Sequence, residues 1–461
     1  MSARVVDVVV VGGGLAGLRA AGLLAGVGAR VVVLEARDRV GGRTLSQPLG
    51  GGTIDLGGQW IGPRQTRIAG LARELGVPTF RQYAQGRKIL ALGGGMASYR
   101  GTIPSIPLLS ALDLHLLIGR LEWLCRRVPL ERPYEAARAA EWDGWTLEDW
   151  ARRRVRTPEA RGVFEGAVRA IFACEPDEIS FLHFLSFLNA GGGLLQLAKT
   201  RGGAQQLRFV EGAQTISRRL AARLGDRVVL GAPVHAIEQD DDGVTVRGAF
   251  RSYRASHVVV AAPPRLAGRI AYRPALPPAR TRLMREVRMG SVIKAVVAYD
   301  RPFWREGGFS GEVVSDGETV RLAFDASPED GSPGALVAFI LGSAARTWSG
   351  SDPDARRRAV LADLTRFFGR PAGRPRGYVD QDWTVDEWSG GCYSGLLPPG
   401  ALTGCGQALR APIGRIHWAG TETAVRSYGY MDGAVESGER AAAEVAARLE
   451  RRIAQAAAAP A

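Results

Sequence analysis

One stretch near the N-terminus limits the possible folds more than any other: "DVVVVGGGLAGLRAAGLLAGVGARVVVLEARDRVGGRT". Its valine run is typical of a buried parallel strand. Gly12, Gly14 and Gly17 form a GxGxxG pattern between this strand and an alanine- and leucine-rich helix, predicted from about residue 15 to 25. A second valine strand ends at Glu35. This order of elements is the fingerprint of a Rossmann-like dinucleotide-binding fold.

The fingerprint also predicts the chemistry of the bound group. Glycine permits a tight turn and lets a pyrophosphate approach the helix N-terminus, where free N–H groups and the helix dipole favour an anion. Glu35 is expected to bind the two hydroxyls of the adenosine ribose, and a carboxylate there disfavours a 2′-phosphate. The pattern therefore indicates FAD or NAD rather than NADP.

The segment after Glu35 distinguishes between these two dinucleotides. Gly41, Gly42 and Arg43 in "RVGGRT" resemble the second glycine motif of flavoproteins with two dinucleotide-binding folds, which points to FAD. In the following "TIDLGGQWIG" we expect backbone and an aromatic wall beside the cofactor, supplied by Gly57, Gly58, Gln59 and Trp60.

The rest of the chain indicates a second domain inserted into the first. Its 461 residues favour two domains. Helical periodicity dominates from about residue 110 to 195, where Thr146 is a predicted N-cap with Asp149 three residues later. We predict a mixed α/β protein whose FAD domain is assembled from three segments, with an inserted substrate-binding domain of sheet plus helices. The expected bounds are 1–80, 210–283 and 386–452 for the FAD domain, 81–209 and 284–385 for the substrate domain, and 453–461 for a disordered tail.

Composition excludes several classes of protein. The formal charge is +14, but only Lys88, Lys199 and Lys294 are lysines, and the arginines are spread along the whole chain. The densest basic runs, 151–156 and 354–358, have acidic neighbours and no interleaved aromatic residues. This distribution indicates a solvated surface rather than a nucleic-acid partner. The four cysteines and five histidines form no CxxC pair and no cluster, which predicts neither a disulfide framework nor a metal site and fits the cytoplasm. We expect no membrane anchor.

Motifs in the second half of the chain carry a specific resemblance. "MGSVIK" with "PFW", "SGGCY", "LPPG", "WAGTET" and "GYMDGAVESGERAA" occur in the order seen in flavin-containing monoamine oxidases. The resemblance covers nearly the whole chain. The protein is similar to a soluble member of that family, without the C-terminal membrane anchor of the mitochondrial enzymes.

The resemblance implies roles for four residues near the flavin. Cys392 matches the cysteine that forms a thioether to the 8α carbon of the flavin, and the two glycines before it are expected to let the chain lie against the ring. Tyr393 and Tyr430 match the two aromatic residues that form a cage for the amine. Lys294 matches the lysine that holds a water against flavin N5, and it stands out in a chain that otherwise uses arginine.

Further residues follow from the same resemblance. The implied cofactor contacts are Val234, Trp383, Gly420, Thr421, Glu422 and Met431. The implied lining of the substrate pocket is Ile171, Phe172, Leu197, Gln205, Leu322 and Phe339.

The implied reaction is oxidation of a primary or secondary amine at its α carbon, with a hydride equivalent passing to flavin N5. Hydrolysis of the imine gives an aldehyde and ammonia or a smaller amine, and O2 reoxidises the flavin to release H2O2. The expected partners are an amine and O2, and a homodimer is left open as the oligomeric state.

Other activities remain open from the sequence. An L-amino-acid oxidase would need an arginine facing the pocket, and a polyamine oxidase tends to place acids along its tunnel. A carotenoid- or porphyrin-type desaturase would share the front motif but lack "SGGCY". A basic nucleic-acid-binding flavoprotein is the remaining alternative.

Overall fold

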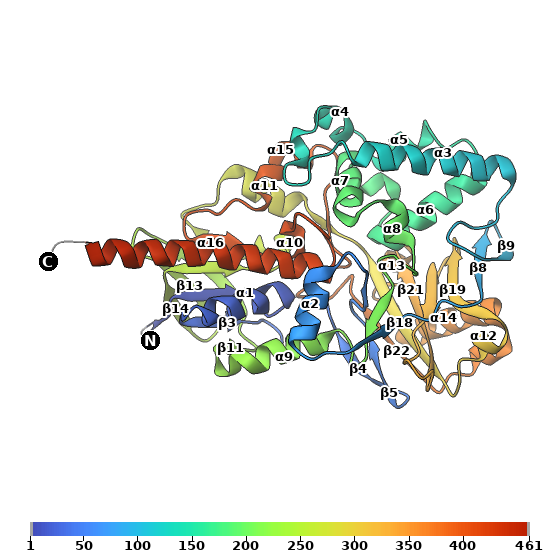
Figure 1. The fold of residues 1–461 in the computed structure, drawn as a ribbon, viewed down its shortest axis with the longest axis horizontal. Helices are drawn as coiled ribbons and strands as arrows, with labels where there is room; N and C mark the ends of the chain where they lie inside the picture. Colours follow the sequence, from blue (N-terminus) through green and yellow to red (C-terminus); the bar gives the residue numbers. More distant parts are fainter. Residues whose placement is uncertain (1–2, 459–461) are drawn as a thin grey trace.

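The front of the chain forms a parallel sheet, as its valine runs predict. In the computed structural model, which describes residues 3–458, β2 (Val8–Val11) pairs with β3 (Val31–Leu34) at the centre of this sheet. β11 (Val228–Val229), β15 (His257–Val260) and β24 (Ile416–Trp418) complete the order β11-β3-β2-β15-β24, and every pair is parallel. Strands from three distant parts of the chain therefore build one dinucleotide-binding sheet (Figure 1).

The two faces of this sheet are covered differently, because successive strand residues point to opposite sides. Val8 and Val10 pack with α1 (Leu15–Gly26) and α16 (Met431–Ala458), whereas Val9 packs on a second sheet. The order of the second sheet is β1-β14-β13-β12-β16. Its strands are β1 (Arg4–Val5), β12 (Val234–Gln239), β13 (Val244–Gly248), β14 (Ser252–Ala255) and β16 (Ala271–Arg273).

A seven-stranded sheet forms the base of the second domain. One of its faces packs on α14 (Pro353–Phe368), and the other turns toward the first domain. In spatial order its strands are β22 (Gly377–Asp382), β18 (Val292–Tyr299), β21 (Gly334–Leu341), β20 (Leu322–Asp325), β19 (Phe309–Ser315), β8 (Arg87–Leu92) and β9 (Gly95–Tyr99).

A single row of residues crosses this sheet from strand to strand. Lys294 on β18 pairs with Phe339 on β21, and Phe339 pairs with Leu322 on β20. Leu322 pairs with Val314 on β19, and Val314 pairs with Leu90 on β8. Paired residues share a face of a sheet, so side chains that are far apart in sequence line one surface.

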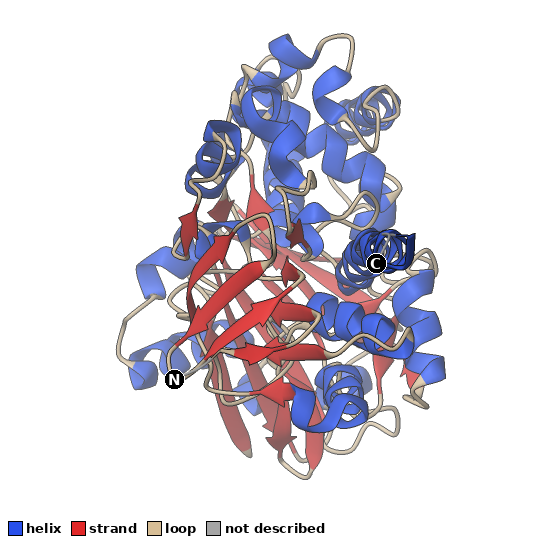
Figure 2. Cartoon of the chain, turned by 90° about the vertical axis from the view of Figure 1, so that its left-hand side faces the viewer, coloured by secondary structure: helices blue, strands red, loops and turns tan. Residues whose placement is uncertain are grey.

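Helices cover the substrate side of the seven-stranded sheet and fill the upper part of the molecule (Figures 1 and 2). The predicted N-cap is confirmed, since Thr146 and Asp149 form a reciprocal capping box. The helices are α3 (Leu108–Cys125), α4 (Ala139–Asp143), α5 (Leu147–Arg152), α6 (Pro158–Phe172), α7 (Phe181–Gly191) and α8 (Leu194–Ala198).

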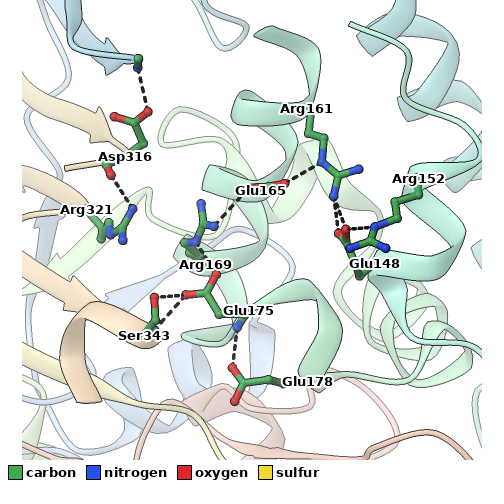
Figure 3. A network of polar contacts seen from close by, with 11 residues as sticks. Glu148, Arg152, Arg161, Glu165, Arg169, Glu175, Glu178, Asp316, Arg321 and Ser343 are labelled. Carbon is green, nitrogen blue, oxygen red and sulfur yellow. Dashed lines mark hydrogen bonds and ion pairs between the residues drawn. The ribbon is translucent and has the colours of Figure 1, made fainter. Parts of the chain in front are cut away.

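A network of charged side chains holds α6 against the seven-stranded sheet (Figure 3). Arg169 on α6 binds Glu165 at 3.1 Å and Glu175 at 2.7 Å. Glu175 also accepts a 2.7 Å hydrogen bond from the hydroxyl of Ser343, just after β21. The network continues through Arg161, Glu148 and Arg152. The position of α6 over the sheet is therefore set by polar contacts as well as by packing.

The C-terminal helix is longer than the sequence analysis predicted. α16 continues to Ala458, past residue 453 where the disordered tail was expected to begin. Alanine has the highest helix propensity, so the alanine-rich end extends the helix. Residues 459–461 lie outside the described part of the chain. Within the described residues, every helix is too short or too polar to span a membrane.

We predict that Glu175→Gln destabilises the protein by about 1–3 kcal/mol, because hydrogen bonds to a charged group are lost. Burial raises the pKa of Glu175, but the Ser343 hydrogen bonds and the Arg169 guanidinium outweigh it and leave that pKa below its usual value. The stabilisation is therefore present above pH about 4.3 and is lost as the pH falls further. Urea unfolding of both proteins across this pH range measures the difference.

The exposed neighbour Asp177 provides the matched control for this prediction. Asp177→Asn should leave the free energy of unfolding nearly unchanged. A wild-type advantage over Glu175→Gln that grows as the pH falls would contradict the assignment.

Candidate active site

One cavity of about 600 Å³ joins the two domains. It begins at the glycine turn after β2 and ends against the seven-stranded sheet and α6. The predicted cofactor residues in its wall are Gly12, Gly14, Glu35, Arg43, Gly57, Gly58, Gln59, Trp60, Val234, Trp383, Gly420, Thr421 and Met431. The predicted reactive and pocket residues in its wall are Lys294, Cys392, Tyr393, Tyr430, Ile171, Leu197, Gln205, Leu322 and Phe339.

Three predicted site residues lie behind this wall. A Cβ on Gly17 would stand 2.0 Å from the carbonyl oxygen of Gly12, so Gly17 allows α1 to pack on the turn. Phe172 packs against Phe187 at a ring separation of 4.5 Å. Glu422 is 1% exposed and binds a cavity residue instead of facing the cavity itself. These residues support the site from outside.

The first glycine turn fits a pyrophosphate. α1 begins at Leu15, and its N-cap residue, Gly14, supplies no side-chain hydrogen bond to the first turn. The N–H groups there are left for an anion. Gly14 also faces Gly42 of the second glycine motif, and a Cβ on Gly42 would lie 3.4 Å from the Cα of Gly14. Side chains at these positions would fill the space between the two turns, so the glycines keep a cradle open.

The acid at the end of β3 is held by backbone N–H groups. Glu35 is 4% exposed, and its two carboxylate oxygens accept hydrogen bonds from Gly13 N at 2.6 Å and Arg37 N at 2.9 Å. These bonds fix the carboxylate in the cavity wall. They leave lone pairs for the two hydroxyls of a ribose, because a carboxylate offers about four acceptor positions.

Arg43 and Glu422 form a buried ion pair beside the cavity. Two guanidinium nitrogens of Arg43 bind the Glu422 carboxylate at 2.6 and 3.0 Å. One of them also donates to the carbonyl oxygen of Tyr393 at 2.9 Å. Gly395 N donates to Glu422 at 3.1 Å. The pair therefore ties the second glycine motif to the loop that carries Cys392.

One of the glycines before Cys392 has a packing role that the sequence analysis did not predict. Gly391 has φ +130°, and a Cβ there would lie 2.5 Å from both the carbonyl oxygen of Gly290 and the Cβ of Met289. Cys392 N donates to the same carbonyl of Gly290 at 3.0 Å. The close approach is thus to the chain ahead of β18, and in this loop the described cavity wall includes Cys392 but neither Gly390 nor Gly391.

Lys294 is buried in the cavity wall. It is 2% exposed, and its ammonium nitrogen donates to the carbonyl oxygen of Gly57 at 2.7 Å and to the side-chain oxygen of Gln59. The nitrogen lies 5.4 Å from the ring centre of Phe339 and 5.9 Å from that of Trp60. Burial lowers the pKa of Lys294 to about 7, although Asp55 raises it. A large share of the molecules therefore carries a neutral Lys294 near neutral pH.

Aromatic rings enclose the chamber next to Lys294. Tyr393 packs on Phe339 at a ring separation of 6.4 Å, and Tyr430 packs on Phe187 at 6.1 Å. Trp60 contacts Phe339 at 5.9 Å, so it belongs to the same wall. Burial raises the pKa of both tyrosines far above its usual value, which keeps them neutral. At the end near Lys294 the chamber is an aromatic box whose two tyrosines carry no charge.

Gln205 is one of the few polar side chains in this chamber. Its amide nitrogen donates to the carbonyl of Leu197 at 3.0 Å, while its side-chain oxygen is buried without a partner among the described residues. An unpaired buried oxygen is costly, so a donor on a bound molecule is its natural partner.

The sequence analysis missed several residues of the chamber. Phe187 and Phe324 looked like ordinary core positions, and only the three-dimensional packing brings them to the wall. Glu312 was also missed, because an isolated acid in a short strand carries no motif. Other additions include Tyr99, Val163, Ala167 and Val314.

Together these features define a class of protein. A dinucleotide cradle opens directly into an aromatic chamber with a buried lysine, an arrangement that suits an oxidoreductase acting on a small molecule. In agreement, the chain matches the family described as flavin containing amine oxidoreductase over residues 15–446.

Relatives of known sequence identify the family more closely. A probable flavin-containing monoamine oxidase A from Dictyostelium discoideum is 42% identical over 446 residues, which cover 96% of this chain and 98% of the relative. A putative flavin-containing monoamine oxidase AofH from Mycobacterium tuberculosis (strain ATCC 25618 / H37Rv) is 43% identical over 448 residues, which cover 96% of this chain and 97% of the relative.

Solved structures show the same fold. Putrescine oxidase bound to putrescine superposes with a TM-score of 0.93 at 32% identity, covering 97% of this chain and 100% of that chain. Cyclohexylamine oxidase from Brevibacterium oxydans IH-35A also gives a TM-score of 0.93, at 34% identity, covering 96% and 99%. This chain belongs to the flavin-containing amine oxidase family and is an FAD-dependent amine oxidase.

We predict that Lys294 makes the stability of the protein depend on pH. Between pH about 7 and its usual pKa of about 10.4, the unfolded chain binds a proton on Lys294 that the folded chain has lost, so stability rises with pH. The free energy of unfolding of wild type, measured relative to Lys294→Met, should increase across this range by up to about 1.4 kcal/mol per pH unit. Urea unfolding at several pH values tests this.

Lys199→Met is the matched control, because Lys199 is outside the described cavity wall. Its pH dependence should stay close to that of wild type. A constant difference between wild type and Lys294→Met from pH 7 to 10 would argue against a buried, partly neutral lysine.

Proposed function

We propose that this enzyme oxidises apolar primary amines, which bind as neutral molecules between Tyr393 and Tyr430. The observation that carries this proposal is the uncharged aromatic chamber beside Lys294. Aromatic faces attract a nitrogen group, while apolar walls disfavour a full positive charge.

The chain's own residues then perform three tasks. Tyr393 and Tyr430 orient the amine, and the apolar walls exclude water from the reacting carbon. Lys294 already donates to Gly57 and Gln59, and its remaining position, a third N–H in the ammonium or the lone pair in the neutral amine, can bind a water in the chamber. FAD, when bound, accepts the hydride equivalent from the α carbon and is later reoxidised by O2, which yields H2O2. Water hydrolyses the released imine to the aldehyde and ammonia.

We infer that the remaining wall residues hold the cofactor. Gly12, Gly14 and Gly42 would accept the pyrophosphate, and Glu35 the adenosine ribose. Thr421 and Met431, where α16 begins, would face the other end of the cofactor.

We further infer a covalent link through Cys392. Its thiol is 5% exposed, lies in the cavity wall and is held next to Tyr393 by the Gly290 contact. Burial raises the pKa of this thiol to about 12, while Arg43 lowers it. A thioether to the flavin 8α carbon would replace the S–H bond and one C–H bond of that carbon, would leave the two electrons on the flavin for O2 to remove, and would fix the ring beside the aromatic chamber. All four cysteines are free and buried, which supports a cytoplasmic location.

The charged side chains in the cavity wall argue against an L-amino-acid oxidase, which is the closest alternative activity. The arginines in the described cavity wall are Arg37, Arg43 and Arg269. All three come from the segments expected to form the FAD domain. An oxidase of amino acids would need such a side chain at the substrate end. A polyamine oxidase has more support, because Glu312 lies in the chamber wall, but Glu312 is already paired with Lys88.

We predict a distinct substrate and pH profile. Benzylamine and tryptamine should release H2O2 faster than putrescine or leucine, because the described chamber has no free charge for a second ammonium or a carboxylate. The value of kcat/KM should rise with pH until the substrate is neutral. A peroxide-coupled assay from pH 6 to 10 measures both, and leucine as the best substrate would refute the proposal.

We predict that acid precipitation of wild-type enzyme carries the yellow colour into the pellet, as a thioether survives denaturation. Cys392→Ala should leave the colour in the supernatant. Cys405→Ala is the control, because that thiol is buried outside the cavity and should not alter the result. A colourless wild-type pellet would show that FAD is held without a covalent bond.

A further inference from the structure

A buried carboxylate lies in the far wall of the chamber and has no part in the chemistry described above. Glu312 on β19 lines the cavity and is 9% exposed. One of its oxygens accepts a 2.7 Å hydrogen bond from Lys88, and the other lies 3.4 Å from the hydroxyl of Thr200. A buried ion pair is often no more stable than an apolar pair of the same size, so stability alone does not explain it.

Glu312 lies two residues before Val314 on β19, so alternation along the strand places both side chains on the chamber face. The pairing of β19 with β8 shifts between Phe309 and Val313. The residue just before Glu312 is Gly311, which has φ +82°, and a Cβ there would lie 2.8 Å from Asp325 N. Glycine is therefore required at this point of the strand. The strand therefore presents an acid on a surface that is mostly apolar.

The sheet sets the distance between Glu312 and the reacting end of the chamber. Lys294 lies on β18, and β21 and β20 separate that strand from β19. Neighbouring strands are about 4.8 Å apart, so three steps place the β19 backbone about 14 Å from that of β18. A substrate whose nitrogen lies near Tyr393 can therefore reach Glu312 only with its opposite end.

The charge around Glu312 limits what that end can be. Its hydrogen-bonding neighbours are the Lys88 ammonium and the Thr200 hydroxyl. The ion pair is neutral as a whole, so a second ammonium would leave a buried net charge, which is costly. A hydroxyl adds no charge, and a carboxylate with about four acceptor positions has room for one more donor.

We propose that Glu312 determines specificity by accepting a hydrogen bond from a hydroxyl group at the end of the substrate remote from the amine. The preferred substrates are then long amines that are apolar in the middle and carry a terminal hydroxyl. This inference rests on the proposed function, because the nitrogen must occupy the end near Tyr393 and Tyr430.

Two matched series of substrates test the inference. Linear alkylamines from propyl to decyl are compared with the amino alcohols of equal chain length, using peroxide release to measure kcat and KM. In wild type, the ratio of kcat/KM for amino alcohol over alkylamine should rise at the chain length that reaches Glu312. The Glu312→Leu/Lys88→Met double variant removes both charges together and should lower that ratio about tenfold. The change should appear in KM, since a remote contact contributes uniform binding.

Two further variants keep the test decisive. Glu312→Gln retains an acceptor and the side-chain shape, so it should lower the ratio of kcat/KM less than the double variant does. It replaces the double variant if that protein does not fold. Glu318→Gln changes an exposed acid near the same strand and should leave the ratio unchanged.

Three results would overturn the inference. The first is an unchanged ratio in both Glu312 variants. The second is a wild-type preference for diamines over amino alcohols of equal length, which would make Glu312 an ammonium site. If wild type oxidises benzylamine but neither series, this inference fails and the proposed function stands; if it oxidises none of these amines, both fail.

Discussion

The active site depends on the buried ion pair between Arg43 and Glu422. Arg43 belongs to the second glycine motif near the N-terminus, and Glu422 lies in the turn after the last parallel strand. Through Tyr393 and Gly395 the same pair also holds the loop that carries Cys392. Removing one partner of such a pair leaves an uncompensated buried charge, so the three segments are joined by one interaction that tolerates little change.

Burial around this pair gives the chamber its electrostatic character. The same loss of solvent lowers the pKa of Lys294 and raises those of Cys392, Tyr393 and Tyr430. All four shifts favour the uncharged form, so desolvation acts in one direction on acids and bases alike. A site built in this way selects the uncharged form of its substrate without needing a dedicated base.

The sequence predicted the parts of the fold that depend on local pattern. The valine runs, the GxGxxG turn and the Thr146 cap each specify a structure within a few residues, and the described structure contains all three. Predictions that depend on long-range packing were less complete. Gly391 proved to face Gly290, a contact between segments about 100 residues apart. Glu312 was missed because an isolated acid in a short strand carries no motif, and only the packing of β19 brings it to the cavity wall.

The row of paired residues that crosses the seven-stranded sheet has a consequence for how such enzymes diverge. Lys294, Phe339, Leu322 and Val314 lie on successive neighbouring strands, so this wall of the chamber runs across the strands. Each strand then contributes one residue to this wall, and successive wall residues are separated by the strand spacing of about 4.8 Å. A single substitution changes one of these wall residues, while the backbone hydrogen bonds between the strands stay intact. Substrate length can therefore change in discrete steps during evolution without any change in the fold that holds the flavin.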